Sequence, residues 1–165
     1  MAEGRAEVVR HNHPGRGGRA LATPKGRQVD PDAQDRVRET LGEAPRRRDL
    51  LIEHLHKIQD RYGHLSAAHL VALAAEMKMA LAEVYEVATF YAHFDVVDDG
   101  QEPPPPITVR VCDSIACALA GAEDLLKALD GSLPGTRVMR APCMGGCDRA
   151  PVAAVGHRQL DRITP

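Results

Sequence analysis

Four consecutive prolines, Pro103 to Pro106, divide the chain into two parts that cannot share one regular element. Proline lacks a backbone N–H donor and its ring restricts φ, so such a run favours extended polyproline geometry and excludes a helix or a central strand. The acidic stretch DDGQE precedes the prolines. We therefore predict a semi-rigid Pro-rich linker over residues 98–106, with a subdomain on either side.

Helical periodicity dominates the segment before the linker, and residues 46–97 are predicted to form a helical bundle. One helix is predicted from about Arg46 to Tyr62, ending at Gly63. A second begins after the capping residue Ser66, and a third runs from about Ala80 to Tyr91. In each helix the apolar side chains recur every three or four positions and share one face, as Leu51, Leu55 and Ile58 do.

Residues 1–45 are predicted to be a flexible basic arm with one short helix, which starts at Asp30-Pro31 and stops at Gly42. Positive charges outnumber negative ones over residues 1–48, while the reverse holds over 49–165. The arm is either a disordered terminus or a strap for an acidic partner surface. No nucleic-acid partner is expected, because the body is acidic and the arm lacks interleaved aromatic residues.

Beyond the linker the pattern changes to an alternation of strand and helix. ITVRVC and GTRVMRA alternate as strands do, and one continuous helix is predicted over ALAGAEDLLKAL between them. VAAV and RQLDRI are predicted to form a hairpin that turns at Gly156-His157. Thr164-Pro165 resembles a helix start. The fold class is therefore α+β, and we expect residues 107–165 either to lack a terminal helix or to continue into a longer chain.

All four cysteines of the chain lie in this second part, which indicates one shared site. Cys112 ends the first predicted strand and Cys117 follows five positions later, whereas Cys143 and Cys147 lie on the loop CMGGC. The spacing is CxxxxC followed by CxxxC. Gly145 and Gly146 permit positive φ and keep side chains away, so that backbone amides can point at sulfur; the alternative is that they serve only a tight turn.

The expected compartment limits what four cysteines can do. The N-terminus has no apolar run of a signal peptide, and no stretch approaches the ~18 apolar residues of a membrane span. A soluble, cytoplasmic protein is expected, where stable disulfides are uncommon and grouped cysteines bind metal or do redox chemistry. Four thiolates can hold one zinc ion or a two-iron cluster. The wide pairs favour iron and sulfur, with zinc as the alternative.

Several stretches resemble the thioredoxin-like [2Fe–2S] subunit family of NADH dehydrogenase, the 24 kDa type. They are LLIEHLHKIQDRYGHLS, ATFYAHF, VCDSIACALAGAEDLLKAL and CMGGCDRAPVAAV. The family also occurs in bidirectional hydrogenases and NAD-dependent formate dehydrogenases. The resemblance implies a thioredoxin-like [2Fe–2S] ferredoxin domain over residues 107–165. It also implies that Cys112 and Cys117 ligate one iron, and Cys143 and Cys147 the other.

Within that family the chain looks most like the N-terminal domain of the formate dehydrogenase beta subunit. The resemblance implies an electron carrier beside FMN in the NAD-reducing diaphorase part of a molybdenum- or tungsten-dependent enzyme. Its partners would be a flavin- and NAD-binding domain or subunit and a formate dehydrogenase catalytic subunit. Further clusters and the metal-pterin centre would reside there, because this chain offers no catalytic residue for formate or hydride chemistry. Equivalent subunits of NADH dehydrogenase or an NAD-linked hydrogenase are the alternative.

Two functions of other classes compete for the same residues. The segment LSAAHLVALAAEMKMALAEVYEVATFYAHF has a helix-turn-helix pattern, which would suit a redox-sensing regulator. Its second helix carries Glu83 and Glu86 and no basic residue, whereas a recognition helix is expected to be basic. A zinc-stapled interaction module is the second alternative, and it would bind zinc without iron.

Overall fold

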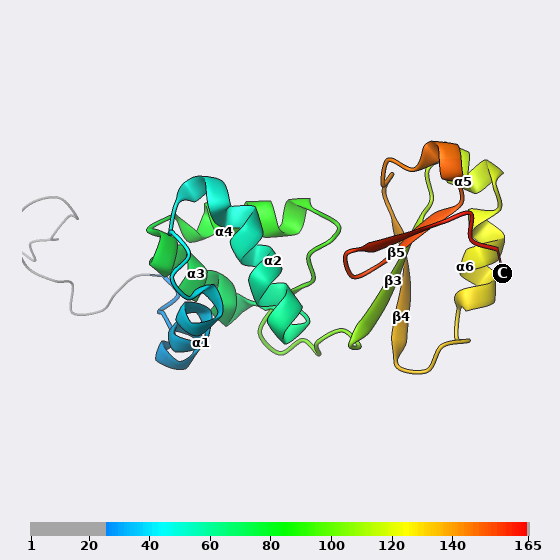
Figure 1. Cartoon of the computed structure of the whole chain (residues 1–165). Helices are drawn as coiled ribbons and strands as arrows, with labels where there is room; N and C mark the ends of the chain where they lie inside the picture. Colours follow the sequence, from blue (N-terminus) through cyan, green and yellow to red (C-terminus); the bar gives the residue numbers. More distant parts are fainter. Residues whose placement is uncertain (1–25, 165) are drawn as a thin grey trace, which may run out of the picture.

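The computed structural model describes residues 26–164, which form a helical part and a cysteine part joined by an extended segment (Figure 1). We call residues 26–97 the helical part and residues 107–164 the cysteine part. The first 25 residues, with most of the predicted basic arm, and Pro165, where a continuing helix was expected, lie outside the described residues.

Four α-helices build the helical part: α1 (Pro31–Leu41), α2 (Leu51–Tyr62), α3 (Ala67–Met77) and α4 (Leu81–Phe90). A short 3-10 turn, η1 (Arg48–Leu50), leads into α2, so this helix begins later than the predicted Arg46. Two short strands that the sequence did not predict, β1 (Leu65–Ser66) and β2 (Val96–Val97), pair in parallel.

Local capping chemistry explains where these helices begin and end. Asp30 accepts a hydrogen bond from the Asp32 amide at 2.9 Å, and Ser66 Oγ accepts one from the His69 amide at 3.1 Å. Gly63 ends α2 in the left-handed conformation, with φ 76°. These predicted caps are confirmed, because each depends on residues close in sequence.

The core of the helical part draws on all four helices, including α1. The fully buried side chains come mainly from α2 and α3 and include Leu55, Ile58 and Leu73. Val37 of α1 is also fully buried in this core. The sequence interpretation grouped this helix with the arm, but its buried face makes it an integral part of the helical core.

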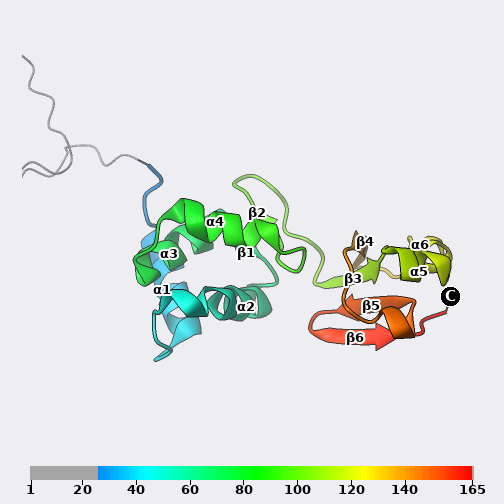
Figure 2. The ribbon, with the colours of Figure 1, turned by 90° about the horizontal axis from the view of Figure 1, so that it is seen from above.

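A four-stranded mixed sheet forms the centre of the cysteine part. Its strands are β3 (Ile107–Cys112), β4 (Thr136–Ala141), β5 (Val152–Val155) and β6 (Arg158–Asp161), in the order β4-β3-β5-β6. β3 runs parallel to β4 and antiparallel to β5, and β5 and β6 form the predicted hairpin. Helices α5 (Ile115–Leu119) and α6 (Ala122–Leu129) lie together on one side of the sheet (Figure 2).

The predicted continuous helix over residues 118–129 is wrong. Gly121 has φ 94°, which lies outside helical geometry, and the chain breaks there into α5 and α6. As a result Leu119, predicted to share the apolar face of one helix, is 86% exposed, whereas Leu125 of α6 is buried. Glycine adopts this conformation without the steric cost that other residues meet.

A buried ion-pair network joins the two parts. Asp95, which follows the helical part's α4, accepts a hydrogen bond from Arg110 Nη2 of β3 at 2.8 Å and pairs with Arg137 of β4. The Arg110 side chain is only 7% exposed. Its neighbours along β3, Val109 and Val111, face the apolar core instead, as strand alternation requires.

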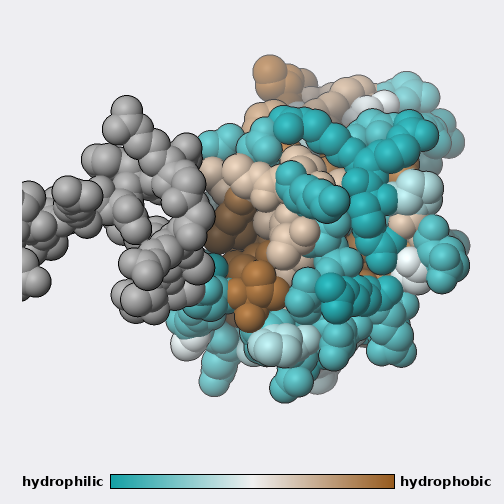
Figure 3. Space-filling model, turned by 90° about the vertical axis from the view of Figure 1, so that its left-hand side faces the viewer, coloured by the Kyte–Doolittle hydropathy of each residue, from teal (hydrophilic) through white to brown (hydrophobic). Residues whose placement is uncertain are grey.

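Hydrophilic residues make up much of the helical part's outer face, and hydrophobic residues gather in a hollow near its middle (Figure 3). Among residues 26–164, no helix combines the length and the apolar character that crossing a bilayer requires.

Candidate functional site

The parallel pairing of β3 and β4 carries both cysteine pairs to the same end of the sheet. Cys112, the last residue of β3, is aligned with Ala141, the last residue of β4. The Asp113 amide donates to the Ala141 carbonyl at 3.1 Å and extends this alignment into the loops. Because Cys143 follows two residues after Ala141, the CxxxC loop begins beside Cys112.

Contacts among the thiols place all four cysteines in one neighbourhood. Cys143 Sγ and Cys147 Sγ are 3.5 Å apart. Cys117 is hydrogen-bonded through its side chain to Cys112, and charge on Cys112 acts on Cys147. The sulfurs are thus arranged as two adjacent pairs.

The two pairs differ in burial. Cys112 and Cys117 are each 1% exposed and belong to the core of the cysteine part. Cys143 and Cys147 are exposed, on the loop and at the start of the short 3-10 helix η2 (Cys147–Arg149). One side of the site is therefore held in the core, and the other faces outward.

Backbone amides oppose the cost of placing negative charge on the buried thiols. Burial disfavours the Cys112 thiolate, yet hydrogen bonds from the Ser114 amide, Cys117 and the Met144 amide outweigh it and lower the pKa of Cys112. Burial and the hydrogen bond with Cys112 raise the pKa of Cys117. The amides of Ser114 and Met144 had no signal in the sequence, because every residue type except proline supplies the same donor.

The pKa of Cys147 is also raised, as that of Cys117 is, but the main cause differs. The two largest causes are the hydrogen bond with Cys143 and the charge of Cys143, and both raise the pKa of Cys147. A thiol with a raised pKa stays protonated until metal binds. It then releases its proton, because the thiolate is the ligand.

The two loop glycines serve different purposes. Gly145 has φ 82°, and its amide donates to Cys143 Sγ at 3.5 Å, as expected from the sequence. Gly146 does not adopt positive φ, because its φ is −96°. Position 146 instead leaves no room for a side chain, because a Cβ there would lie 2.8 Å from Gln159 Nε2 and 2.9 Å from Val152 Cγ2.

The donor set fits a thiolate-bound iron–sulfur centre. Four cysteine sulfurs in two pairs match the ligand count of a binuclear cluster, in which each iron takes two thiolates. Amide donors at the sulfurs are the kind of outer contact that tunes such a centre. Zinc also takes four thiolates, but as one tetrahedral set rather than as two pairs.

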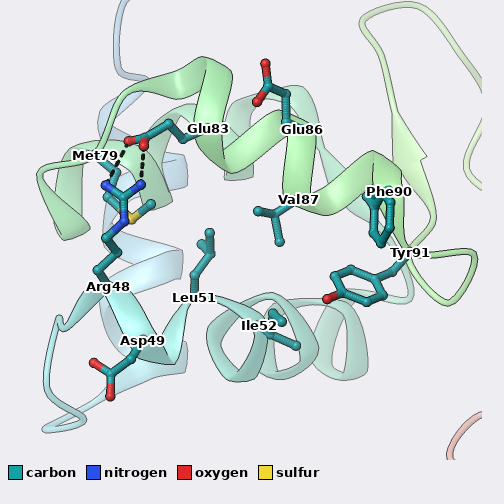
Figure 4. A pocket seen from close by; sticks show the side chains of 10 residues that line it. All are labelled: Arg48, Asp49, Leu51, Ile52, Met79, Glu83, Glu86, Val87, Phe90 and Tyr91. Carbon is teal, nitrogen blue, oxygen red and sulfur yellow. Dashed lines mark hydrogen bonds and ion pairs between the residues drawn. The ribbon is translucent and has the colours of Figure 1, made fainter.

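A groove of 510 Å³ lies between α2 and α4, away from the cysteines. It is lined mainly by apolar residues, among them Leu51, Val87 and Phe90, and Arg48 pairs with Glu83 at one end (Figure 4). No cysteine lines it, so its chemistry is separate from that of the sulfur site.

Comparisons with known proteins agree with this geometry. The family model described as thioredoxin-like [2Fe–2S] ferredoxin matches residues 37–165. An NADH-quinone oxidoreductase subunit of Aquifex aeolicus is 32% identical over 134 residues, which cover 75% of this chain and 81% of that protein. The HndA subunit of the NADP-reducing hydrogenase of Solidesulfovibrio fructosivorans is 31% identical over 131 residues, covering 73% and 74%.

A solved structure has a similar fold over part of its chain. In the crystal structure of an air-oxidised NAD⁺-reducing [NiFe]-hydrogenase, a chain matches with a TM-score of 0.55 and 25% identity. The match covers 70% of this chain but only 20% of the hydrogenase chain, so this chain spans about a fifth of that chain's length.

Proposed function

The chain belongs to the thioredoxin-like [2Fe–2S] ferredoxin family, and from this premise we propose that it transfers single electrons within an NAD(P)-linked oxidoreductase complex. The family's cluster supplies one-electron chemistry when it is bound. Cys112 and Cys117 are proposed to ligate one iron and Cys143 and Cys147 the other, in the cytoplasm. The observation that carries this proposal is the meeting of both cysteine pairs at the carboxyl ends of β3 and β4.

Each cysteine pair has a distinct role in this proposal. The buried pair, Cys112 and Cys117, anchors the centre in the core, where amide donors support the thiolates. The exposed pair, Cys143 and Cys147, brings the centre to the surface, where a redox partner can approach. An electron carrier needs this combination of rigid attachment and an accessible edge.

We place the partner surface beside the cysteines on α5. Ile115 and Leu119 are 81% and 86% exposed, and their i, i+4 spacing puts them on one face of the helix. Cys117, between them in sequence, points into the core. Exposed apolar side chains next to a redox centre suit contact with a flavin-bearing domain or subunit, which we propose as the immediate partner.

At the finer level we propose that the complex is a molybdenum- or tungsten-dependent formate dehydrogenase with an NAD-reducing FMN module. The support is the resemblance of RRRDLLIEHLHKIQDRYGHLS and CMGGCDRAPVAAVGH to the beta subunit of those enzymes. The Aquifex aeolicus and Solidesulfovibrio fructosivorans relatives belong to NADH-quinone oxidoreductase and hydrogenase complexes, which are the competing assignments.

Anaerobic reconstitution with iron and sulfide tests the cofactor. We expect a reddish-brown protein with two irons and two sulfides per chain, as a binuclear cluster requires. Cys143→Ser removes a ligand and should abolish the colour, whereas Leu119→Ala, the matched control on the partner surface, should retain it. A colourless chain holding one zinc ion would instead establish the zinc-stapled module.

Isolation of the native complex through a tag on this chain tests the finer assignment. We expect formate to reduce NAD⁺ in the isolated complex and to reduce the chain's cluster, followed by low-temperature electron paramagnetic resonance. Reduction by H₂ but not by formate would assign the chain to a hydrogenase, and quinone-coupled NADH oxidation would assign it to NADH dehydrogenase. Leu119→Ala is expected to weaken recovery of the flavin-bearing partner.

A further inference from the structure

Three histidines from distant segments meet where the helical part contacts the cysteine part. His56 lies on α2, His93 in the turn after α4, and His157 in the turn between β5 and β6. Their ring centroids are 4.7 to 5.1 Å apart, and one potential ligand nitrogen of each lies within 4.8 Å of the others. In Figure 1 the β5–β6 hairpin points towards the helical part. We call these residues the histidine cluster.

Hydrogen bonds from surrounding residues orient the ring of His157 and fix the backbone at His93. His157 Nε2 is 2.8 Å from Asp60 Oδ1, a carboxylate on α2. The His93 carbonyl accepts hydrogen bonds from Gln59 Nε2 and from Arg110 Nη2, both at 2.8 Å. Gln59 and Arg110 are buried, so the backbone at His93 is fixed from both parts of the molecule.

The third histidine carries an unsatisfied polar atom. His56 Nδ1 is buried and, among the described residues, has no hydrogen-bond partner. A buried nitrogen without a partner is costly, and a bound ion is one way to satisfy it. His54 Nδ1 and His69 Nδ1 are also unpartnered among the described residues, but only His56 lies beside two further histidine ligand atoms. Burial lowers the pKa of His56 and of His93. Burial thus favours the neutral ring, which is the form of imidazole that coordinates metal.

We propose that His56, His93 and His157 bind a divalent transition-metal cation, Zn²⁺ being the ion that this nitrogen set fits best. Imidazole nitrogens suit zinc, whereas Mg²⁺ and Ca²⁺ prefer oxygen ligands. The contact with Asp60 occupies His157 Nε2 and leaves Nδ1 to coordinate, and a carboxylate partner of this kind orients metal-binding histidines. Three protein ligands leave the fourth tetrahedral position to solvent.

Coordination requires the three rings to close slightly. Zinc–nitrogen bonds of about 2.0–2.1 Å in tetrahedral geometry place nitrogens about 3.4 Å apart, compared with up to 4.8 Å here. His157 is exposed and lies on a two-residue turn, so it is the residue that can move. The bound ion therefore fastens the β5–β6 hairpin to α2 and to the turn after α4, clamping the cysteine part against the helical part.

The test is zinc binding to the full chain after its iron–sulfur centre has been loaded, so that the cysteines are occupied. Calorimetric titration with Zn²⁺ should give one ion per chain beyond the iron. Asp60→Asn is expected to weaken binding by about 10–100-fold, and His157→Gln by at least as much. His64→Gln is the matched control, because the ring of His64 faces that of His69 and lies outside the histidine cluster.

Zinc K-edge absorption on the same samples identifies the ligands. Nitrogen neighbours at about 2.0–2.1 Å support the proposal, whereas sulfur neighbours at about 2.3 Å would place zinc at the cysteines and overturn it. Equal zinc affinity in the wild-type chain and in His157→Gln would also overturn it. Iron and sulfide analysis of each sample reports on the electron-transfer function separately, because the histidine cluster shares no residue with the cysteine site.

Discussion

The helical part and the cysteine part are stabilised in different ways. In the helical part, fully buried leucine, isoleucine and valine side chains from four helices fill a continuous core. The core of the cysteine part is smaller and includes Cys112 and Cys117, which are ligand candidates. Each buried aliphatic side chain contributes roughly 1.5–3 kcal/mol, whereas metal ligands stabilise a fold only once the metal binds. Packing therefore stabilises the helical part, whereas we expect the cysteine part to gain a larger share of its stability from a bound metal centre.

Removing a buried ligand should have the largest effect and should show that the two parts unfold separately. We expect Cys112→Ser to abolish cluster binding and the cooperative unfolding of the cysteine part, because the metal-binding and folding free energies of that part are linked. The helical part should keep its own unfolding transition, because the residues of its core all come from the helical part. In one thermal scan, circular dichroism measures the unfolding transitions and visible absorption measures cluster binding.

Leu73→Ala is the matched change in the other part. Leu73 is fully buried in the helical core, so its truncation should cost about 2–5 kcal/mol while cluster absorption is retained. If either variant shifted both transitions equally, the two parts would be one cooperative unit.

Breaking the network between the parts should have the next largest effect. Asp95→Ala leaves Arg110 buried without its partner carboxylate and is expected to cost about 3–5 kcal/mol in urea unfolding. Asp99→Ala is the control, because the Asp99 pair with Arg27 is exposed and should contribute under about 1 kcal/mol. Similar losses in the two variants would show that burial of the network adds nothing.

Crowding the sulfur loop should have a moderate effect confined to the cysteine part. Gly146→Ala places a methyl group against buried Val152 and should cost about 1–3 kcal/mol, with faster iron release to a chelator. Gly131→Ala introduces only backbone strain, because φ is 67° and no atom lies within 4 Å of the new Cβ. It should leave iron release unchanged, and equal rates in the two variants would contradict a steric role for Gly146.

Mild acid should destabilise the helical part by the smallest amount. Burial, with a smaller effect from Arg36, lowers the pKa of His69 from 6.5 to about 4. Between these values the unfolded chain binds more protons than the folded one, so stability is lost as the pH falls. We expect a loss of about 1–2 kcal/mol between pH 7 and pH 5.

The variant His69→Gln should reduce that slope, measured as the urea midpoint of the helical signal at each pH. Cluster absorption should change little over the same range. An unchanged slope in His69→Gln would assign the acid sensitivity to other groups.

Much of the local structure was predictable because its causes are local. The Asp30 and Ser66 caps, the end of α2 at Gly63 and the Gly156-His157 turn depend on residues a few positions apart. The break at Gly121 was missed, because the apolar spacing of ALAGAEDLLKAL also suits one continuous helix. The left-handed conformation of Gly121 in the folded chain, with φ 94°, separates α5 from α6.

The four cysteines, in a CxxxxC and a CxxxC pair, were enough to predict a thiolate-bound metal centre, and their spacing favoured iron and sulfur over zinc. Where those thiols lie was decided by the parallel pairing of β3 and β4. The tertiary structure alone brought Arg110 to Asp95 and gathered the histidine cluster from three separate segments. Such contacts join residues far apart in the chain, and periodicity reports only the face that a residue occupies on its own element.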